Sequence, residues 1–249
     1  MTPTILRPSI RLGMLVPSSN VVLEPVLSRM AADLPNVSVH FSRFRVTQIA
    51  LDADALGQFS LEPMLAAAEL LADAKVDSIC WNGTSAGWLG FDSDRTLCAT
   101  IEKRTGVRAT SSVLAINRLL KARNLHRIAF VSPYTDDVQE RILATYSAEG
   151  FEVVADRHDR RRDNFSFSEL DAASISRMVR EVAKSKPDAI LVFCTNLWGA
   201  PLAASLETEI GIPLLDTVAA ALWGALTDTG AAPERVEGWG TMFKWRELA

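Results

Sequence analysis

Cysteine and histidine are both scarce in this chain of 249 residues. An odd and small number of cysteines argues against a disulfide scaffold and favours a reducing compartment. The histidines are scattered without the spacing of metal ligands, so we expect no metal site. These residues are Cys80, Cys98, Cys194, His40, His126 and His158.

Long apolar runs are also absent. The stretch from Val218 to Leu226 falls well short of the ~20 residues that a membrane-spanning helix needs. Arg7 and Arg11 interrupt the N-terminal run where an export signal requires continuity. We therefore expect a cytoplasmic protein without a membrane partner. A net charge of −4, from 26 basic and 30 acidic residues, argues against nucleic acid as a partner.

The common nucleotide-binding fingerprints are missing too. The sequence contains neither GxGxxG nor a P-loop motif, so neither a dinucleotide nor a nucleoside triphosphate is indicated, and we expect no cofactor. No GxSxG elbow surrounds Ser85, which argues against a serine nucleophile.

What the chain does contain is a regular alternation of short β-branched runs and longer helical patterns. Strands are expected at residues 11–16, 77–81, 127–131, 152–154 and 188–193. Helices are expected at residues 61–74, 111–121, 136–149, 171–184, 201–209 and 217–226. This order predicts βαβ units, and therefore an α/β fold with parallel sheets.

The two halves of the chain resemble each other at three places that keep their order. Residues 11–20 match 127–136, residues 77–85 match 188–196, and residues 105–113 match 210–218. We infer an internal duplication that gives two pseudo-symmetric Rossmann-like (flavodoxin-like) domains. The first domain is expected at residues 1–114 and the second at 115–226. The tail, 227–249, is expected to pack back on the first.

This duplication predicts where a ligand binds. Ligands of open α/β sheets bind beyond the carboxyl ends of the strands. Two halves that face each other bring both sets of strand ends into one cleft, and the equivalent residues Gly83 and Cys194 then lie opposite each other. The turns that begin at Pro17 and Pro133 are expected to close the same cleft.

Cys194 is the first candidate for chemistry. It follows an apolar strand and precedes a predicted helix, where free backbone N–H groups and the helix dipole are expected to lower its pKa. The alternative is a small buried core residue. Cys80 and Cys98 are expected to be structural.

Gly83, Thr84 and Ser85 occupy the matching place in the first half. Backbone N–H groups and two hydroxyls at a strand-to-helix turn suit a carboxylate. The alternative is an ordinary turn or helix cap. Tyr134 lies in the turn of the second half that matches residues 17–20, where its hydroxyl can donate to an oxyanion; the alternative is a surface aromatic.

Further residues near the ends of the strands are expected to bind substrate. In the first half these are Pro17, Ser18 and Asn20, although Asn20 also suits a helix cap. In the second half Thr195 and Asn196 supply further donors beside the thiol.

As a set, these residues resemble the aspartate/glutamate racemase superfamily, in the branch of maleate cis-trans isomerases and arylmalonate decarboxylases. The carrying segments are residues 15–20, 83–85, 132–136, 194–197 and 209–213. The resemblance implies a cofactor-independent enzyme with two cysteines that face each other across a small mono- or dicarboxylate. It also implies that Asn164 reaches the cleft. A tail that contains Trp239 is compatible with a homo-oligomer.

Here the sequence departs from the family pattern, because Gly83 replaces the first cysteine. Glycine on one face argues against a two-base racemase, and the isomerases of the family need a thiolate at that position. The decarboxylase branch has Gly-Thr-Ser and a single cysteine, as here, whereas residues 17–20 and 194–196 are more like the isomerases. We therefore expect a decarboxylase in which Cys194 is the proton donor. The alternatives are a maleate isomerase-like or racemase-like isomerase and a non-catalytic carboxylate-binding protein.

Overall fold

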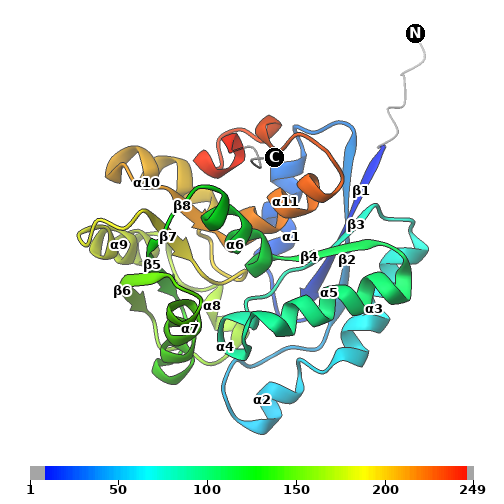
Figure 1. The fold of residues 1–249 in the computed structure, drawn as a ribbon, viewed down its shortest axis with the longest axis horizontal. Coiled ribbons are helices and arrows are strands. Elements are labelled where there is room, and N and C mark those ends of the chain that lie inside the picture. Colours follow the sequence, from blue (N-terminus) through cyan, green and yellow to red (C-terminus); the bar gives the residue numbers. More distant parts are fainter. Residues whose placement is uncertain (1–8, 246–249) are drawn as a thin grey trace.

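Two separate parallel sheets organise the structure, a computed structural model that describes residues 9–245. Figure 1 shows them side by side, each with four strands. The first sheet has the order β2-β1-β3-β4 and the second has the equivalent order β6-β5-β7-β8. The strands are β1 Ile10–Pro17, β2 Val37–Phe44, β3 Ser78–Trp81, β4 Arg108–Ser111, β5 Arg127–Ser132, β6 Glu152–His158, β7 Ala189–Val192 and β8 Leu214–Asp216. The expected α/β fold with two similarly built halves is confirmed.

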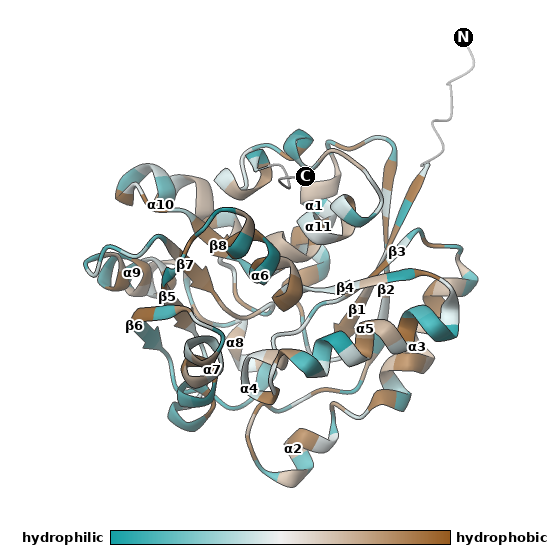
Figure 2. Ribbon diagram, in the orientation of Figure 1, coloured by the Kyte–Doolittle hydropathy of each residue, from teal (hydrophilic) through white to brown (hydrophobic). Residues whose placement is uncertain are grey.

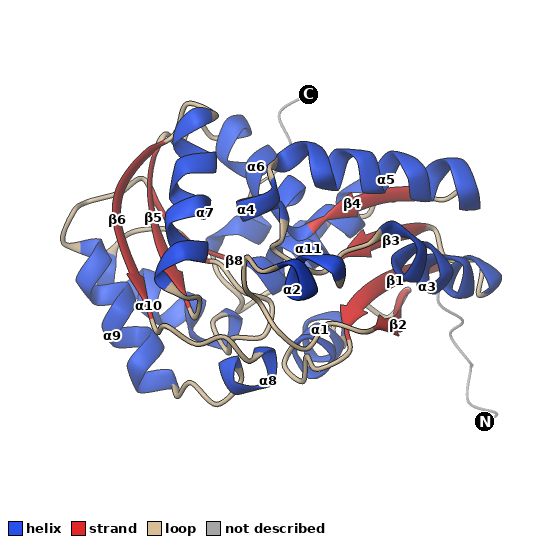
Figure 3. Ribbon diagram, turned by 90° about the horizontal axis from the view of Figure 1, so that it is seen from below, coloured by secondary structure: helices blue, strands red, loops and turns tan. Residues whose placement is uncertain are grey.

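Helices and short 3-10 turns connect the strands and cover the sheets. In the view of Figure 3, helices flank both sheets and many connecting loops lie in the space between them. The helices are α1 Leu23–Ala31, α2 Ala53–Gly57, α3 Leu61–Asp73, α4 Ala86–Leu89, α5 Phe91–Thr105, α6 Ser112–Ala122, α7 Asp136–Ala148, α8 Asn164–Phe167, α9 Ala172–Ala183, α10 Ala203–Ile210 and α11 Thr217–Asp228. The 3-10 turns are η1 Ala200–Leu202, η2 Pro233–Arg235 and η3 Thr241–Lys244.

The central strands are apolar because both faces of each sheet are covered. Strands β3 and β7 are buried along their whole length, as expected for parallel strands between helices. Figure 2 shows hydrophobic residues along the strands, whereas helix surfaces such as that of α5 carry hydrophilic ones. No helix of residues 9–245 is long and apolar enough to cross a membrane.

Equivalent carboxylates bond to equivalent strands in the two halves. The Asp77 carboxylate accepts a hydrogen bond from the backbone N–H of Arg11 at 2.7 Å. The Asp188 carboxylate accepts one from Arg127 at 2.8 Å. These residues belong to the first two sequence matches, so the duplication extends to side-chain contacts.

At the third sequence match, both halves form the same hydrogen bond next to the end of a helix. Helices α5 and α10 both end at a glycine in the left-handed conformation, Gly106 and Gly211, which glycine adopts without a steric penalty. The Glu102 carboxylate accepts from the N–H of the following strand β4, and Glu207 accepts from that of β8. The helix end and the strand that follows it are therefore joined by the same hydrogen bond in both halves.

Helix α11 joins the two halves, because it packs against β3 and β4 of the first sheet and against α6. The tail beyond it contacts both halves: Thr241 donates to Glu207 of α10, and the Trp239 ring lies 5.8 Å from the guanidinium of Arg29 on α1. The division between residues 114 and 115 stays a prediction.

Two buried carboxyl groups lie at the ends of the edge strands. Asp216 ends β8 and caps α11 by accepting from the N–H groups of Val218 and Ala219. Asp94 on α5 accepts from the hydroxyl of Ser111, which ends β4 and caps α6. Burial raises the pKa of each carboxyl to about 7. Each group therefore contributes stability that is full below its unfolded pKa of about 3.8 and is lost as the pH rises to 7.

We predict that Asp216→Asn makes the pH dependence of stability shallower. Asparagine keeps an acceptor oxygen for the cap but does not titrate. The decline in the free energy of unfolding between about pH 4 and pH 7 is therefore reduced, as measured by urea unfolding across that range. Asp171→Asn is the control, because the pKa of this exposed cap is lowered by hydrogen bonds from Ser174 and its linkage has the opposite sign. An unchanged slope in Asp216→Asn contradicts the assignment.

Candidate active site

The two halves meet at a small cavity beyond the carboxyl ends of the strands. The loops after β1, β3, β5 and β7 all contribute to its wall, as the duplication predicts. The lining residues are Pro17, Val46, Ile49, Phe59, Trp81, Gly83, Thr84, Ser85, Trp88, Tyr134, Asn164, Cys194 and Thr195. Eight of the residues expected in the cleft are in this set, from Pro17 of the first half to Thr195 of the second.

Three expected residues do not line the cavity. The hydroxyl of Ser18 bonds to the backbone of Val46 instead. The side chains of Asn20 and Asn196 are buried and engaged in hydrogen bonds between loops. For these three we propose positioning roles rather than direct contact with a substrate.

Asn20 forms hydrogen bonds between the two halves. Its amide nitrogen donates to the backbone oxygen of Thr195 at 3.0 Å and to the Thr195 hydroxyl at 3.2 Å. Its amide oxygen accepts from the N–H groups of Val22 and Leu23 at the start of α1. The predicted capping role and a cross-cleft contact are thus combined in one side chain.

Asn196 makes the reciprocal contact from the second half. Its amide oxygen accepts from the N–H groups of Val21 and Val22, at 3.0 and 3.3 Å. Its amide nitrogen donates to the backbone oxygen of Asn164 at 2.6 Å. Asn164 in turn donates to the hydroxyl of Ser19 at 2.8 Å, so this loop of the second half reaches the first half, as the resemblance implies.

Cys194 is buried yet lines the cavity, with its sulfur 3.4 Å from the backbone nitrogen of Asn196. The expectation of a lowered pKa is wrong. Burial raises the pKa of the thiol to about 12, although hydrogen bonds from Tyr134 and Asn196 act in the opposite direction. The helix dipole gives little help because α10 starts only at Ala203, after a 3-10 turn. At neutral pH this sulfur is therefore a thiol that can give a proton.

Tyr134 is a buried residue and not a surface aromatic. Its hydroxyl lies 2.5 Å from that of Thr84, which joins the turns after β3 and β5. Burial is the main cause that raises the pKa of Tyr134 well above its usual value. Tyr134 therefore stays protonated and can donate to an anion between the halves.

The space beside Gly83 is filled by Trp81, which was not among the residues expected in the cleft. A Cβ atom on Gly83 would lie only 2.0 Å from Cζ2 of the Trp81 ring. Trp81 ends strand β3, and residues i and i+2 of an extended chain point to the same side. That spacing, Trp-Asn-Gly, is the signal in the sequence that could have revealed the contact.

The cavity has a volume of about 20 Å³, which is room for about one water molecule. A larger cavity of about 450 Å³ adjoins it and shares Phe59, Trp81 and Ser85 as walls. A substrate larger than water therefore requires part of the cavity wall to move.

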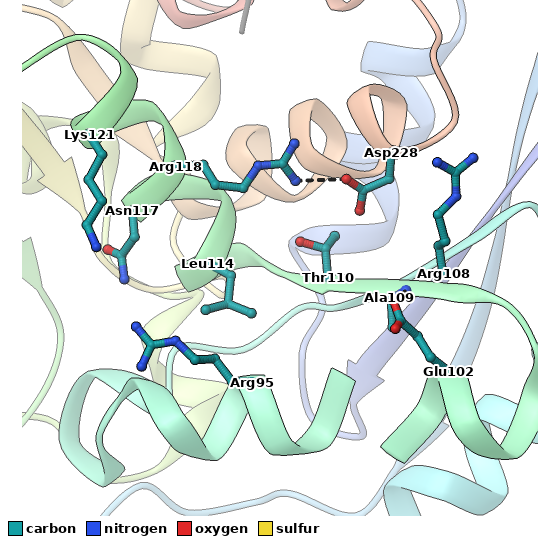
Figure 4. A pocket seen from close by; sticks show the side chains of 10 residues that line it. All are labelled: Arg95, Glu102, Arg108, Ala109, Thr110, Leu114, Asn117, Arg118, Lys121 and Asp228. Atoms are coloured by element: carbon teal, nitrogen blue, oxygen red, sulfur yellow. Dashed lines mark hydrogen bonds and ion pairs between the residues drawn. The ribbon is translucent and has the colours of Figure 1, made fainter. Parts of the chain in front are cut away.

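A separate cavity lies between α5, β4, α6 and α11 (Figure 4). Its wall carries the ion pair Arg118–Asp228 at 2.8 Å, and Figure 4 shows that the basic side chains of Arg95, Arg108 and Lys121 also line it. None of the residues expected in the cleft lines it, and none of its lining residues is a cysteine. Within residues 9–245 no cluster of His, Cys, Asp and Glu could hold a metal ion.

Comparison with known proteins gives matches over nearly the whole chain. A family model described as arylmalonate decarboxylase matches residues 12–243. Maleate isomerase of Nocardia farcinica is 26% identical over 241 residues, which cover 94% of this chain and 95% of the relative. Arylmalonate decarboxylase of Bordetella bronchiseptica is 24% identical over 245 residues, which cover 97% of each.

A solved structure also has the same fold. It is a cysteine-to-serine mutant of Nocardia farcinica maleate cis-trans isomerase with a covalently bound succinylcysteine intermediate. Its TM-score is 0.86 at 23% identity, and the match covers 94% of this chain and 98% of that chain.

We predict that a side chain at Gly83 destabilises the protein through Trp81. Gly83→Ala forces the indole to move and should lower the free energy of unfolding by about 1–3 kcal/mol, the usual cost of overpacking. In combination with Trp81→Leu the cost should shrink, so a double-mutant cycle should give a favourable coupling. Gly57→Ala is the control, because a Cβ there has no neighbour within 4 Å. Additive costs for the Gly83 and Trp81 variants would contradict the contact.

Proposed function

The chain belongs to the arylmalonate decarboxylase family, and on that basis we propose that it removes one carboxylate from a malonate-like substrate, without a cofactor, and protonates the product through Cys194. The chain is an enzyme of this family, whose members include isomerases as well as a decarboxylase. The observation that carries the decarboxylase proposal is that Cys194 supplies the only sulfur in the cavity wall, among the described residues, while Trp81 fills the space beside Gly83.

One carboxylate of the substrate binds to the hydroxyl groups of Thr84, Ser85 and Tyr134 and to nearby backbone N–H groups. These donors lie where negative charge develops as the substrate becomes an enediolate. Removal of one such donor costs about 2.7–4 kcal/mol of transition-state stabilisation in comparable enzymes. Thr84 and Tyr134 are already held together by their 2.5 Å contact, which fixes both donors before the reaction.

The other carboxylate lies against apolar walls such as Val46 and Ile49. No Lys, Arg or His is among the residues that line the cavity. A carboxylate without a cation is poorly stabilised away from water, whereas carbon dioxide is neutral. The surroundings therefore favour cleavage of the bond between the α-carbon and this carboxylate.

The proton balance follows from a protonated Cys194. The electron pair of the broken C–C bond remains on the enediolate, and carbon dioxide leaves. The Cys194 thiol gives its proton to the α-carbon, and the thiolate then recovers a proton from solvent. Because Trp81 occupies the opposite side, protonation takes place on one face only.

Maleate isomerisation is the second candidate function. It is supported by the isomerase relatives and by a succinylcysteine in a related isomerase. A covalent adduct with sulfur requires a nucleophilic thiolate. Burial raises the pKa of Cys194 to about 12, which disfavours that thiolate.

We predict that Cys194→Ala lowers the release of carbon dioxide from phenylmalonate by at least about a hundredfold, because the proton donor is lost. Cys98→Ala, a buried cysteine of α5 outside the cavity, should retain activity. Unchanged turnover in Cys194→Ala would reject the mechanism. Conversion of maleate to fumarate without release of carbon dioxide from phenylmalonate, followed by proton NMR, would favour the isomerase instead.

A further inference from the structure

Two indole N–H groups in the cavity wall have no hydrogen-bond partner. They belong to Trp81 and Trp88, whose side chains are 1% and 5% exposed. Among the residues that line the cavity, these are the only two with a buried side-chain nitrogen or oxygen left unpaired in the described structure. A buried donor without an acceptor costs free energy, so this pair in one site calls for an explanation.

Two other buried or half-buried indoles show the usual arrangement. Trp223 donates to the backbone oxygen of Trp245 at 3.3 Å, and Trp198 donates to that of Ser168 at 3.1 Å. Neither Trp223 nor Trp198 lines the cavity. Among the described residues, a buried indole nitrogen without a partner is therefore found only at this site.

The donor of Trp81 lies at the turn that holds Gly83. A Cβ atom on Gly83 would be 2.5 Å from Cε2 of Trp81, and Cε2 is bonded to the indole nitrogen. Gly83 itself lines the cavity. The indole nitrogen of Trp81 is thus bonded to a ring atom that covers Gly83 in the cavity wall.

The ring of Trp88 lies against the other anion-binding group. Its centroid is 5.4 Å from that of Tyr134, in an edge arrangement, and 5.9 Å from that of Phe59. Tyr134 is bonded to Thr84. Trp88 therefore lies beside the hydroxyl pair to which the substrate carboxylate is assigned, and Trp81 lines the same cavity.

A ligand in the cavity can supply the acceptor that these donors lack. The wall contains no Lys, Arg or His that could attract an anion by charge. A carboxylate is an acceptor-only group with two oxygens, which suits two separate N–H donors. The aromatic rings of Phe59 and Trp88 also suit an aryl substituent, because aromatic pairs prefer edge-to-face contacts.

We propose that Trp81 and Trp88 donate their indole N–H groups to a carboxylate of an aryl-substituted substrate, so that this enzyme holds its anion with neutral donors alone. This inference rests on the proposed function. It assigns Trp81 two tasks: its ring blocks one face of the site, and its nitrogen holds the substrate.

The test is a titration of the full-length protein, labelled with ¹⁵N at its six tryptophans, with phenylacetate at constant ionic strength. Phenylacetate carries the aryl group and one carboxylate but has no second carboxylate to lose. We expect the indole proton signals of Trp81 and Trp88 to move downfield with one common dissociation constant. The signal of Trp223 should stay in place, because its acceptor is a backbone oxygen. The variants Trp81→Phe and Trp88→Phe assign the signals.

The same variants measure the strength of the contacts. Each keeps an aromatic ring but loses the N–H, so each should weaken phenylacetate binding by about tenfold or more, as expected for a hydrogen bond to a charged group. Trp223→Phe is the matched control, because this indole is as buried as that of Trp81. It should leave the affinity unchanged.

The outcomes separate this inference from the proposed function. Binding that shifts backbone signals at Thr84 and Tyr134 but neither indole would overturn the indole contacts and leave decarboxylation standing. Absence of binding would also overturn them, and turnover of phenylmalonate would then decide the proposed function independently. Equal affinity in Trp81→Phe, Trp88→Phe and the native protein would reject a recognition role even if the signals move.

Discussion

The contact between the Trp81 ring and the turn at Gly83 determines the chemistry that the site can perform. It fills the space beside Gly83, in the wall of the cavity that Cys194 also lines, and leaves no space for a side chain at residue 83. A reaction that needs proton transfer on both faces of a carbon is thereby excluded unless Trp81 moves. A reaction that ends with one protonation is favoured, which is why decarboxylation fits this site better than racemisation.

The rest of the structure holds that arrangement in place. The two sheets present equivalent strand ends to one cavity, and Asn20 and Asn196 bond across it in both directions. The cavity is small and no charged side chain lines it, and burial keeps Cys194 and Tyr134 protonated. The same lack of charge leaves a substrate carboxylate dependent on neutral donors. Burial thus keeps the catalytic thiol protonated and also leaves the substrate carboxylate without a neighbouring cation.

Much of this could be predicted from the sequence, because it follows from topology. The alternation of strands and helices gave the α/β fold, and the internal matches placed Gly83, Tyr134 and Cys194 at one cavity. Strands β2, β4 and β8 were not predicted. In β2 the side chains are mostly half-buried, and polar residues such as His40 interrupt the apolar pattern. Strands β4 and β8 have only four and three residues.

What could not be predicted depends on side-chain packing. The pKa of Cys194 is raised, whereas a lowered pKa was expected. The effect of burial outweighs that of the helix dipole, because the helix starts at Ala203 instead of beside the thiol. The role of Trp81 depends on where its ring lies, which a strand pattern does not specify. Asn20 was assigned to substrate binding because its hydrogen bonds to Thr195, which lies far away along the chain, cannot be read from the sequence.

The most direct measurement of the central claim is the decarboxylation of methylphenylmalonate in D₂O, followed by analysis of the configuration and isotope content of the product. If Cys194 is the one proton donor and Trp81 blocks the other face, the product is a single enantiomer. It carries one deuterium at the α-carbon and does not exchange it on further incubation. A racemic product, or continued exchange at that carbon, would reveal a second proton-transfer group on the Trp81 side and contradict the account.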